Sequence, residues 1–455
     1  MRKTVHPQPS LFPVYIQHSR ADELRAVSEV LDDAPGLARF VRLDLCDGVD
    51  ADNGRKGMSA EQVLRCAVAQ KLEQWTFDEL AFHLADSQSF RAFCRIGLSD
   101  DPPGKSTLHE NISKISMRTW QTINRMLVGD AAKDGIERGR KVRFDCTVTE
   151  TDIHHPTDAL LCVDLIRVAC RILQRLRDDE GHSIIFRNHE LRSRRRANNI
   201  RNRRKKSAKK AAYEDLLEVM RKTRSYLEDA RKLLIAKADI DAPWELIWDD
   251  IDTLAGLIRQ ADAIIEQTWR RVVVEEKVPA DQKIYSIFEE HTDIIVKKRR
   301  KVEFGHKLCL AVGPSSLVLD VTIEDGNPAD STLAQKMIDR QIRLFRRPPR
   351  QVAFDGGFAS KDNVAALKEM GVADVAFHKK RGLKINDMVK SSWVYRRLRR
   401  FRAGIEGIVS WLKRCFGLTR CSWHGLDGFK RYVWSSVVAA NALTLARHRI
   451  AARDG

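Results

Sequence analysis

Three acidic residues stand where their carboxylates could serve catalysis: Asp145, Asp355 and Glu406. Asp355 directly follows an apolar run and precedes two glycines ("VAFDGG"), so it lies where a buried strand ends and the chain turns. Asp145 lies within "KVRFDCTVT", whose alternating β-branched and aromatic residues predict a strand. Glu406 lies on "RAGIEGIVSWLKRCFG", residues 402–417, which is typical of an amphipathic helix.

Each acid also has a purely structural interpretation. Asp355 could be a turn aspartate. Asp145 could face solvent, since an acid in a strand that points into the core is costly without a partner. Glu406 could form a surface ion pair with Arg402, four residues earlier. A shared site is favoured because the three acids occur in the order that one fold requires.

Converging carboxylates repel one another and raise each other's pKa unless a cation joins them. Mg²⁺ prefers oxygen ligands, and two such ions can activate an attacking hydroxyl and stabilise a leaving oxygen in phosphate chemistry. We therefore expect Asp145, Asp355 and Glu406 to be catalytic and to bind two Mg²⁺ ions, for which Mn²⁺ can substitute. Arg402 and Lys413 flank Glu406 on one helix and are expected to hold phosphates.

The predicted elements follow a recognisable order. They are a strand at 141–149, a mainly helical segment at 157–275, strands at 306–313 and 316–323, a helix from Thr332, a strand ending at Asp355, a helix at 361–370, a strand at 374–377 and final helices. Without the long helical segment, this is the order of a ribonuclease-H-like fold. We predict a mixed α/β protein with a five-stranded mixed sheet flanked by helices. In that fold the three acids would meet.

Several segments together resemble the DDE transposases of bacterial insertion sequences, in particular the ISNCY group. They are "RFDCTVTETDIHHPTDALL", "IYSIFEEHTDII", "FGHKLCLAVG", "EDGNPADS", "AFDGGFAS" and "RAGIEGIVSWLKRCFGL", within a similarity that runs from about residue 57 to 447. The resemblance implies that Asp145, Asp355 and Glu406 are the family's catalytic acids. Arg402, Glu406 and Lys413 match its tyrosine–arginine–glutamate–lysine signature, whereas Arg399 replaces the tyrosine.

The chain is expected to divide into four parts. We predict an N-terminal arm at 1–56, a helical DNA-binding or dimerisation domain at 57–135, a discontinuous catalytic domain at 136–156 and 280–455, and a basic helical insertion at 157–279. In the helical domain, Ser59 with Gln62 and Thr76 with Glu79 have capping-box spacing. In the insertion, apolar residues recur at helical spacing on both sides of Pro243, which predicts an antiparallel hairpin.

Positive charge indicates a polyanionic partner. The formal net charge is +18, and eleven of the nineteen residues from 192 to 210 are Lys or Arg, with no acid among them. The positive charges of such a run repel one another unless they bind phosphates. We expect double-stranded DNA to be the partner, bound by basic residues of this run: Arg194, Arg195, Arg196, Arg203, Arg204, Lys205 and Lys206.

The resemblance therefore implies an insertion-sequence transposase, an endonuclease and polynucleotidyl transferase. It would bind the terminal inverted repeats, cleave DNA, and join the 3′-OH to target DNA as a homodimer or larger assembly. Nine scattered cysteines without a C-x-x-C pair, and no long apolar run, predict a cytoplasmic, nucleoid-associated protein. The alternatives are a catalytically silent DNA-binding protein derived from a transposase and a stand-alone metal-dependent nuclease of the same fold.

Overall fold

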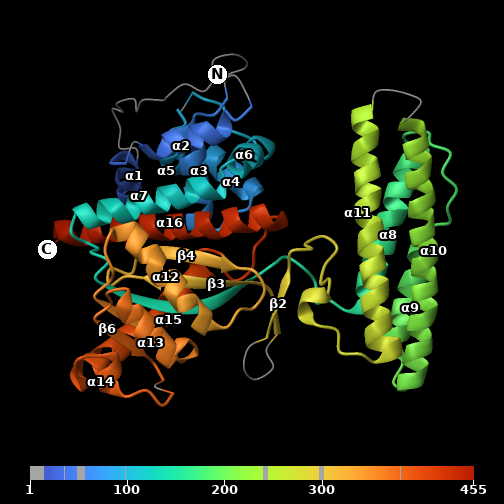
Figure 1. Ribbon diagram of the computed structural model, residues 1–455. Coiled ribbons are helices and arrows are strands. Elements are labelled where there is room, and N and C mark those ends of the chain that lie inside the picture. Colours follow the sequence, from blue (N-terminus) through green and yellow to red (C-terminus); the bar gives the residue numbers. More distant parts are fainter. Residues whose placement is uncertain are drawn as a thin grey trace. The chain divides into compact units, whose positions relative to one another are not determined.

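The chain forms two compact units, shown in the computed structural model of Figure 1: Met1–Thr151 with Gly305–Gly455, and Asp152–Phe304. The structure describes residues 15–34, 36–48, 57–97, 99–238, 244–296, 302–379 and 381–454. Residues 1–14 and 49–56 of the predicted arm, and the loop at Pro243, lie outside the described residues.

The described strands form one mixed sheet of six: β1 (Lys141–Glu150), β2 (Asp293–Val296), β3 (Val302–Val312), β4 (Val318–Glu324), β5 (Gln351–Phe354) and β6 (Asp374–Phe377). In the order β4-β3-β1-β5-β6, β3 is antiparallel to both of its neighbours, and β1, β5 and β6 are parallel. This is the predicted ribonuclease-H-like arrangement. The five-stranded prediction lacked β2, which pairs with β3 and is too short for a clear alternation.

Helices of the C-terminal half pack against this sheet: α12 (Asp330–Phe345), α13 (Lys361–Glu369), α14 (Ile385–Met388), α15 (Ser392–Cys415) and α16 (Gly425–Asp454). The helix that carries Glu406, α15, begins ten residues earlier than the predicted start at 402. The Ser391 hydroxyl caps it by accepting a hydrogen bond from the Val394 amide. The arginines between 396 and 400 therefore belong to the same helix as Glu406.

The described residues before β1 form seven helices: α1 (Ser19–Asp32), α2 (Gly36–Leu45), α3 (Ala60–Glu73), α4 (Phe77–Asp86), α5 (Gln88–Phe93), α6 (Lys105–Ser113) and α7 (Met117–Lys133). Both predicted capping boxes are confirmed, at the start of α3 and of α4. The helices α1, α3 and α7 pack on α16, so the first and last parts of the chain share one core.

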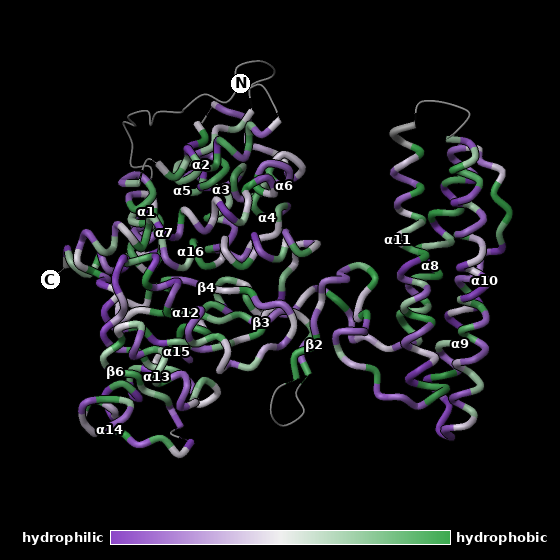
Figure 2. The backbone as a smooth tube through the Cα atoms, viewed as in Figure 1, coloured by the Kyte–Doolittle hydropathy of each residue, from purple (hydrophilic) through white to green (hydrophobic). Residues whose placement is uncertain are grey.

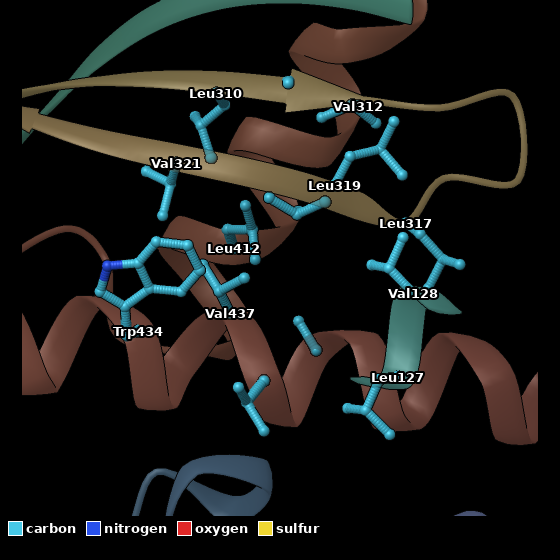
Figure 3. Close-up of a cluster of buried hydrophobic side chains, with 14 of the residues drawn as sticks. Leu127, Val128, Leu310, Val312, Leu317, Leu319, Val321, Leu412, Trp434 and Val437 are labelled. Atoms are coloured by element: carbon cyan, nitrogen blue, oxygen red, sulfur yellow. The ribbon is translucent and has the colours of Figure 1, made fainter. Parts of the chain in front are cut away.

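That core lies between the β3–β4 hairpin and two helices, α7 and α16 (Figure 3). Trp434 and Val437 of α16 face Leu319 and Val321, while Val128 of α7 lies near Leu317. Two buried asparagines reinforce the contact, because Asn441 Nδ2 donates to Asn124 Oδ1 at 2.7 Å and to the Val318 carbonyl at 2.8 Å. The N-terminal helices are thereby anchored to the sheet that carries the acids.

In its described part, the second unit contains four long helices: α8 (Asp158–Asp178), α9 (Glu190–Asn202), α10 (Lys206–Ala238) and α11 (Trp244–Thr268). Apolar positions recur along α10 and α11 between hydrophilic ones (Figure 2), and the two helices pack together as the hairpin prediction requires. No helix in the described part of the chain is long and apolar enough to span a bilayer.

Candidate active site

Asp145 and Asp355 lie side by side because β1 and β5 are parallel neighbours. Phe144 pairs with Phe354 in the register, and their rings stack with centroids 4.5 Å apart. Asp145 directly follows Phe144, and Asp355 directly follows Phe354, so both aspartates lie at the same level of the sheet. Asp145 lies in the interior of β1, whereas Asp355 lies where β5 ends. The carboxyl ends of parallel strands are where open α/β sheets commonly bind ligands.

The two glycines after Asp355 permit a tight turn there. A Cβ on Gly357 would overlap the Asp330 carboxylate, and one on Gly356 would lie 2.9 Å from Lys379 Cβ. Asp355 precedes the short 3₁₀ turn Gly356–Phe358 but makes no side-chain capping bond to it. The alternative of a turn-capping aspartate is therefore not what the structure shows, and the carboxylate is available for the site.

Glu406 reaches the same place because α15 packs across β1, β5 and β6. Gly404 permits close approach of the helix, since a Cβ there would overlap the Arg143 guanidinium. Arg143 of β1 donates from Nη1 to the Phe401 carbonyl at 3.0 Å, which fixes the helix to the central strand. Ile405 and Leu412 are buried, while the Glu406 side chain is 68% exposed. The acid thus points outward from the side of the helix that borders the sheet.

One guanidinium joins the three acids. Arg402 Nη2 lies 2.9 Å from Asp145 Oδ2 and 3.4 Å from Asp355 Oδ1. Nη1 of the same residue lies 2.7 Å from Glu406 Oε1. The Arg402 side chain is only 7% exposed, and its Nε has no hydrogen-bond partner among the described residues. The predicted i,i+4 pair of Arg402 with Glu406 exists, but within a cluster that includes both aspartates.

The environment of Asp145 opposes ionisation. Burial raises the pKa of its carboxyl from 3.8 to about 6; Arg402 lowers this pKa, and the negative charges of Asp355 and Glu406 raise it. The Cys146 amide donates to Asp145 Oδ1 at 2.9 Å, which favours the carboxylate. A carboxyl that one arginine only partly compensates can be stabilised further by additional positive charge.

The donor set suits a hard divalent cation, since it consists of carboxylate oxygens around one positive group. As they stand, no three His, Cys, Asp or Glu side chains of the described residues are close enough to hold a metal ion. The reason is visible in the geometry: Arg402 occupies the space that the acids surround. The carboxylates therefore suit a divalent cation, which would have to take the place of the Arg402 guanidinium.

Arg402 and Lys413 were both predicted as phosphate ligands, but they lie in different environments on α15. Arg402 is buried among the acids, whereas Lys413 is half-buried on α15, seven residues after Glu406 and thus roughly 10 Å along the helix. Arg399, at the signature's tyrosine position, is exposed. Tyr395, one turn earlier, is buried and donates from its hydroxyl to the Phe377 carbonyl at 2.9 Å. It serves the packing of α15 on β6.

The seven basic residues predicted to bind DNA lie on α9, on the segment after it and at the start of α10. Three are paired with acids: Arg194 with Glu190, Arg196 with Asp215 and Lys206 with Glu275. Arg203 Nε donates to Asn199 Oδ1 at 3.0 Å. The others are exposed without an ion pair to any described residue: Arg195, Arg204 and Lys205.

Exposed arginines lie on the first half of α15, and the sequence analysis considered only Arg399 among them: Arg396, Arg397, Arg399 and Arg400. They precede Arg402 on the helix that carries Glu406. Their helical spacing was the available signal, but the helix was predicted to begin only at residue 402. The structure therefore adds a row of positive charge that leads to the acids.

Comparison with known families gives two matches. The family described as Transposase DDE domain matches residues 280–442, and Transposase domain (DUF772) matches residues 13–114. Asp355 and Glu406 lie inside the first match; Asp145 lies before it, beyond the helical insertion. Neither curated proteins nor solved structures gave a significant match. The two matches cover more than half of the chain, and DDE transposases act on DNA with divalent metal ions. The chain is a DDE transposase of the insertion-sequence type.

Proposed function

We propose that this transposase binds the ends of its element, hydrolyses phosphodiester bonds there with two Mg²⁺ ions, and joins the freed 3′-OH to target DNA. One observation carries the proposal: Asp145, Asp355 and Glu406 all pair with the guanidinium of Arg402. Three acids that share one cation can share metal ions instead.

The side chains have distinct roles in this proposal. Asp145 and Asp355 are fixed by adjacent parallel strands, so their carboxylates are preorganised. Glu406 is exposed and can adjust its side chain. When bound, two Mg²⁺ ions supply activation of the attacking hydroxyl and stabilisation of the leaving oxygen. Arg402, once released from the acids, can pair with a phosphate, as Arg does bidentately.

Cleavage of supercoiled plasmid that carries both element ends tests the enzymatic role. Wild-type protein with Mg²⁺ is expected to nick at the ends, and Asp355→Asn to cut roughly a thousandfold more slowly, because a ligand carboxylate becomes neutral. Asp362→Asn, an exposed aspartate of α13, makes the same change outside the site and should cut normally. The proposal fails if wild type cuts no end-bearing DNA or if Asp355→Asn cuts at the wild-type rate.

Strand joining separates the proposal from its alternatives. Purified protein given pre-cleaved ends with a free 3′-OH is expected to insert them into a target plasmid. Cutting without joining would indicate a stand-alone nuclease, and binding without either reaction would indicate a silent DNA-binding protein. Because two ends must be handled together, we expect a homodimer or larger assembly on DNA.

We infer that the basic insertion binds DNA through its unpaired residues. Replacing Arg195, Arg204 and Lys205 together by Gln is expected to weaken DNA binding and to reduce the slope of log K against log[salt] by up to about 3, since each phosphate contact contributes roughly 0.9. The matched control replaces exposed Arg171, Arg221 and Lys232 of the same unit by Gln. Equal slopes for the two triple variants would rule out this role.

A further inference from the structure

A cavity of about 530 Å³ in the first unit is separate from the acids. It lies where α3 and α4 of the N-terminal helices meet the segment after α15 and the start of α16. Its volume is in the range of small-ligand sites. Nothing in the proposed mechanism uses it.

The cavity has aromatic walls. Phe77 and Trp423 are nearly parallel, at an interplanar angle of 23°, with centroids 6.4 Å apart. A base stacked between two rings needs a gap of about 6.8 Å, so these two rings must move apart to admit one. Tyr432 meets Trp423 edge to face at 5.7 Å and closes one side. The walls therefore suit a flat aromatic ligand.

Two buried polar side chains line the cavity, and one of them lacks a hydrogen-bond partner within the described part of the chain. Gln70 is 4% exposed, and its Oε1 has no hydrogen-bond partner among the described residues. Lys71 is 6% exposed and forms no ion pair with any described residue; instead its Nζ makes cation–π contacts, 3.2 Å from the Tyr432 ring centroid and 4.6 Å from the Trp423 ring centroid. Burial lowers the pKa of Lys71 to about 7. Unpaired groups of this kind cost stability, which a ligand that satisfies them would recover.

The position of the cavity relates it to the acids. Phe416, which lines it, follows Glu406 by ten residues along α15, which corresponds to roughly 15 Å. At about 3.4 Å per base pair, DNA whose backbone lies at Glu406 reaches the cavity about four or five nucleotides away. DNA that follows α15 from Glu406 would therefore bring a base to the cavity.

We propose that this cavity binds an unpaired base of the element-end DNA, about four or five nucleotides from the cleaved bond. The inference rests on the proposed function, since it takes the bound DNA as the source of the base. The base stacks on Trp423 and Phe77, and Gln70 Oε1 accepts a hydrogen bond from a base N–H. Lys71 donates to a ring nitrogen or carbonyl oxygen of the base. Stacking on aromatic side chains with hydrogen bonds to the base edge is how proteins hold extruded bases.

A fluorescence scan tests the proposal. Duplexes from the element's own ends carry 2-aminopurine at each of the first eight positions from the cleavage point. They are mixed with full-length Asp355→Asn protein in EDTA, so the result does not depend on cleavage. A fluorescence change confined to one or two positions near four or five is expected. Unchanged fluorescence at every position, with DNA bound, would overturn the proposal.

Cavity variants locate the signal. In the same background, Trp423→Leu and Gln70→Leu are expected to abolish the position-specific change and to weaken end binding by about tenfold. Trp393→Leu removes an exposed tryptophan of α15 outside the cavity and should retain both. Lys71→Met is expected to lose the signal while melting a few degrees higher, because an unpaired buried amine is removed. A Trp423→Leu protein that is folded and keeps the signal contradicts the assignment.

Free nucleotides distinguish the source of the base. Deoxynucleoside monophosphates titrated into the full chain without DNA are expected to bind only at millimolar concentration, since a single base lacks the contacts of the duplex. Micromolar binding that Trp423→Leu abolishes would identify a small-molecule site and overturn the DNA assignment. If the scan succeeds but wild-type protein never cuts, the cleavage proposal fails and the base site remains.

Discussion

An Asp145→Asn variant is expected to lose DNA cleavage and to become more stable at neutral pH. Cleavage should fall by roughly a thousandfold, because the carboxylate at the centre of β1 is a proposed metal ligand. Stability should rise because burial penalises the charge: the pKa of Asp145 is raised from 3.8 to about 6. An amide of nearly the same shape carries no charge to bury.

The pH dependence follows from the sign of this shift. The Asp145 carboxyl holds its proton more tightly in the folded state than in the unfolded state. Its contribution to the free energy of unfolding of the wild type therefore falls as pH rises from about 4 to about 6. Above pH 6 the ionised carboxylate costs the folded state on the order of 1–3 kcal/mol. The advantage of Asp145→Asn is therefore expected at pH 7.5 and not at pH 4.

Melting curves in EDTA at the two pH values measure this effect, with Asp362→Asn as the control for loss of one exposed aspartate. A gain of a few degrees for Asp145→Asn at pH 7.5 is expected. If Asp145→Asn melts below wild type at pH 7.5, the carboxylate is stabilised by Arg402 more than it is penalised by burial.

An Arg402→Met variant is expected to be destabilised by about 2 kcal/mol without metal, because three carboxylates lose their shared cation. The loss is smaller than for a fully buried pair, since Asp355 and Glu406 are 39% and 68% exposed. Mg²⁺ should bind the variant more tightly, because Arg402 no longer competes for the acids. Melting with and without MgCl₂ measures both effects.

The Mg²⁺-dependent rise in melting temperature is therefore expected to be larger for Arg402→Met than for wild type. Arg396→Met, which removes an exposed arginine of the same helix, should melt within about 0.5 kcal/mol of wild type, with an unchanged Mg²⁺ effect. Equal Mg²⁺ shifts in wild type and Arg402→Met would show that the guanidinium does not occupy the metal-binding position.

Prediction from the sequence was strongest where the pattern was local. The strand at 374–377 agrees with β6, both capping boxes formed, and the helix at 361–370 agrees with α13 within one residue. It was weaker where tertiary contacts determine whether an element forms and where it begins. α15 extends back to Ser392 because its arginines face outward while Val394, Tyr395 and Leu398 pack inward. The strand β2 has only four residues and depends on its partner β3.

The sequence by itself determined the fold class, the order of the elements and the three acids, because alternation, helical spacing and turn residues act over a few neighbouring positions. Only the tertiary structure decided that Arg402 lies among those acids and that Lys71 and Gln70 are buried in an aromatic cavity. These contacts join residues that are far apart in the chain. Their contribution to the free energy of folding depends on how deeply the polar groups are buried. No local pattern of residue types records which side chains will meet.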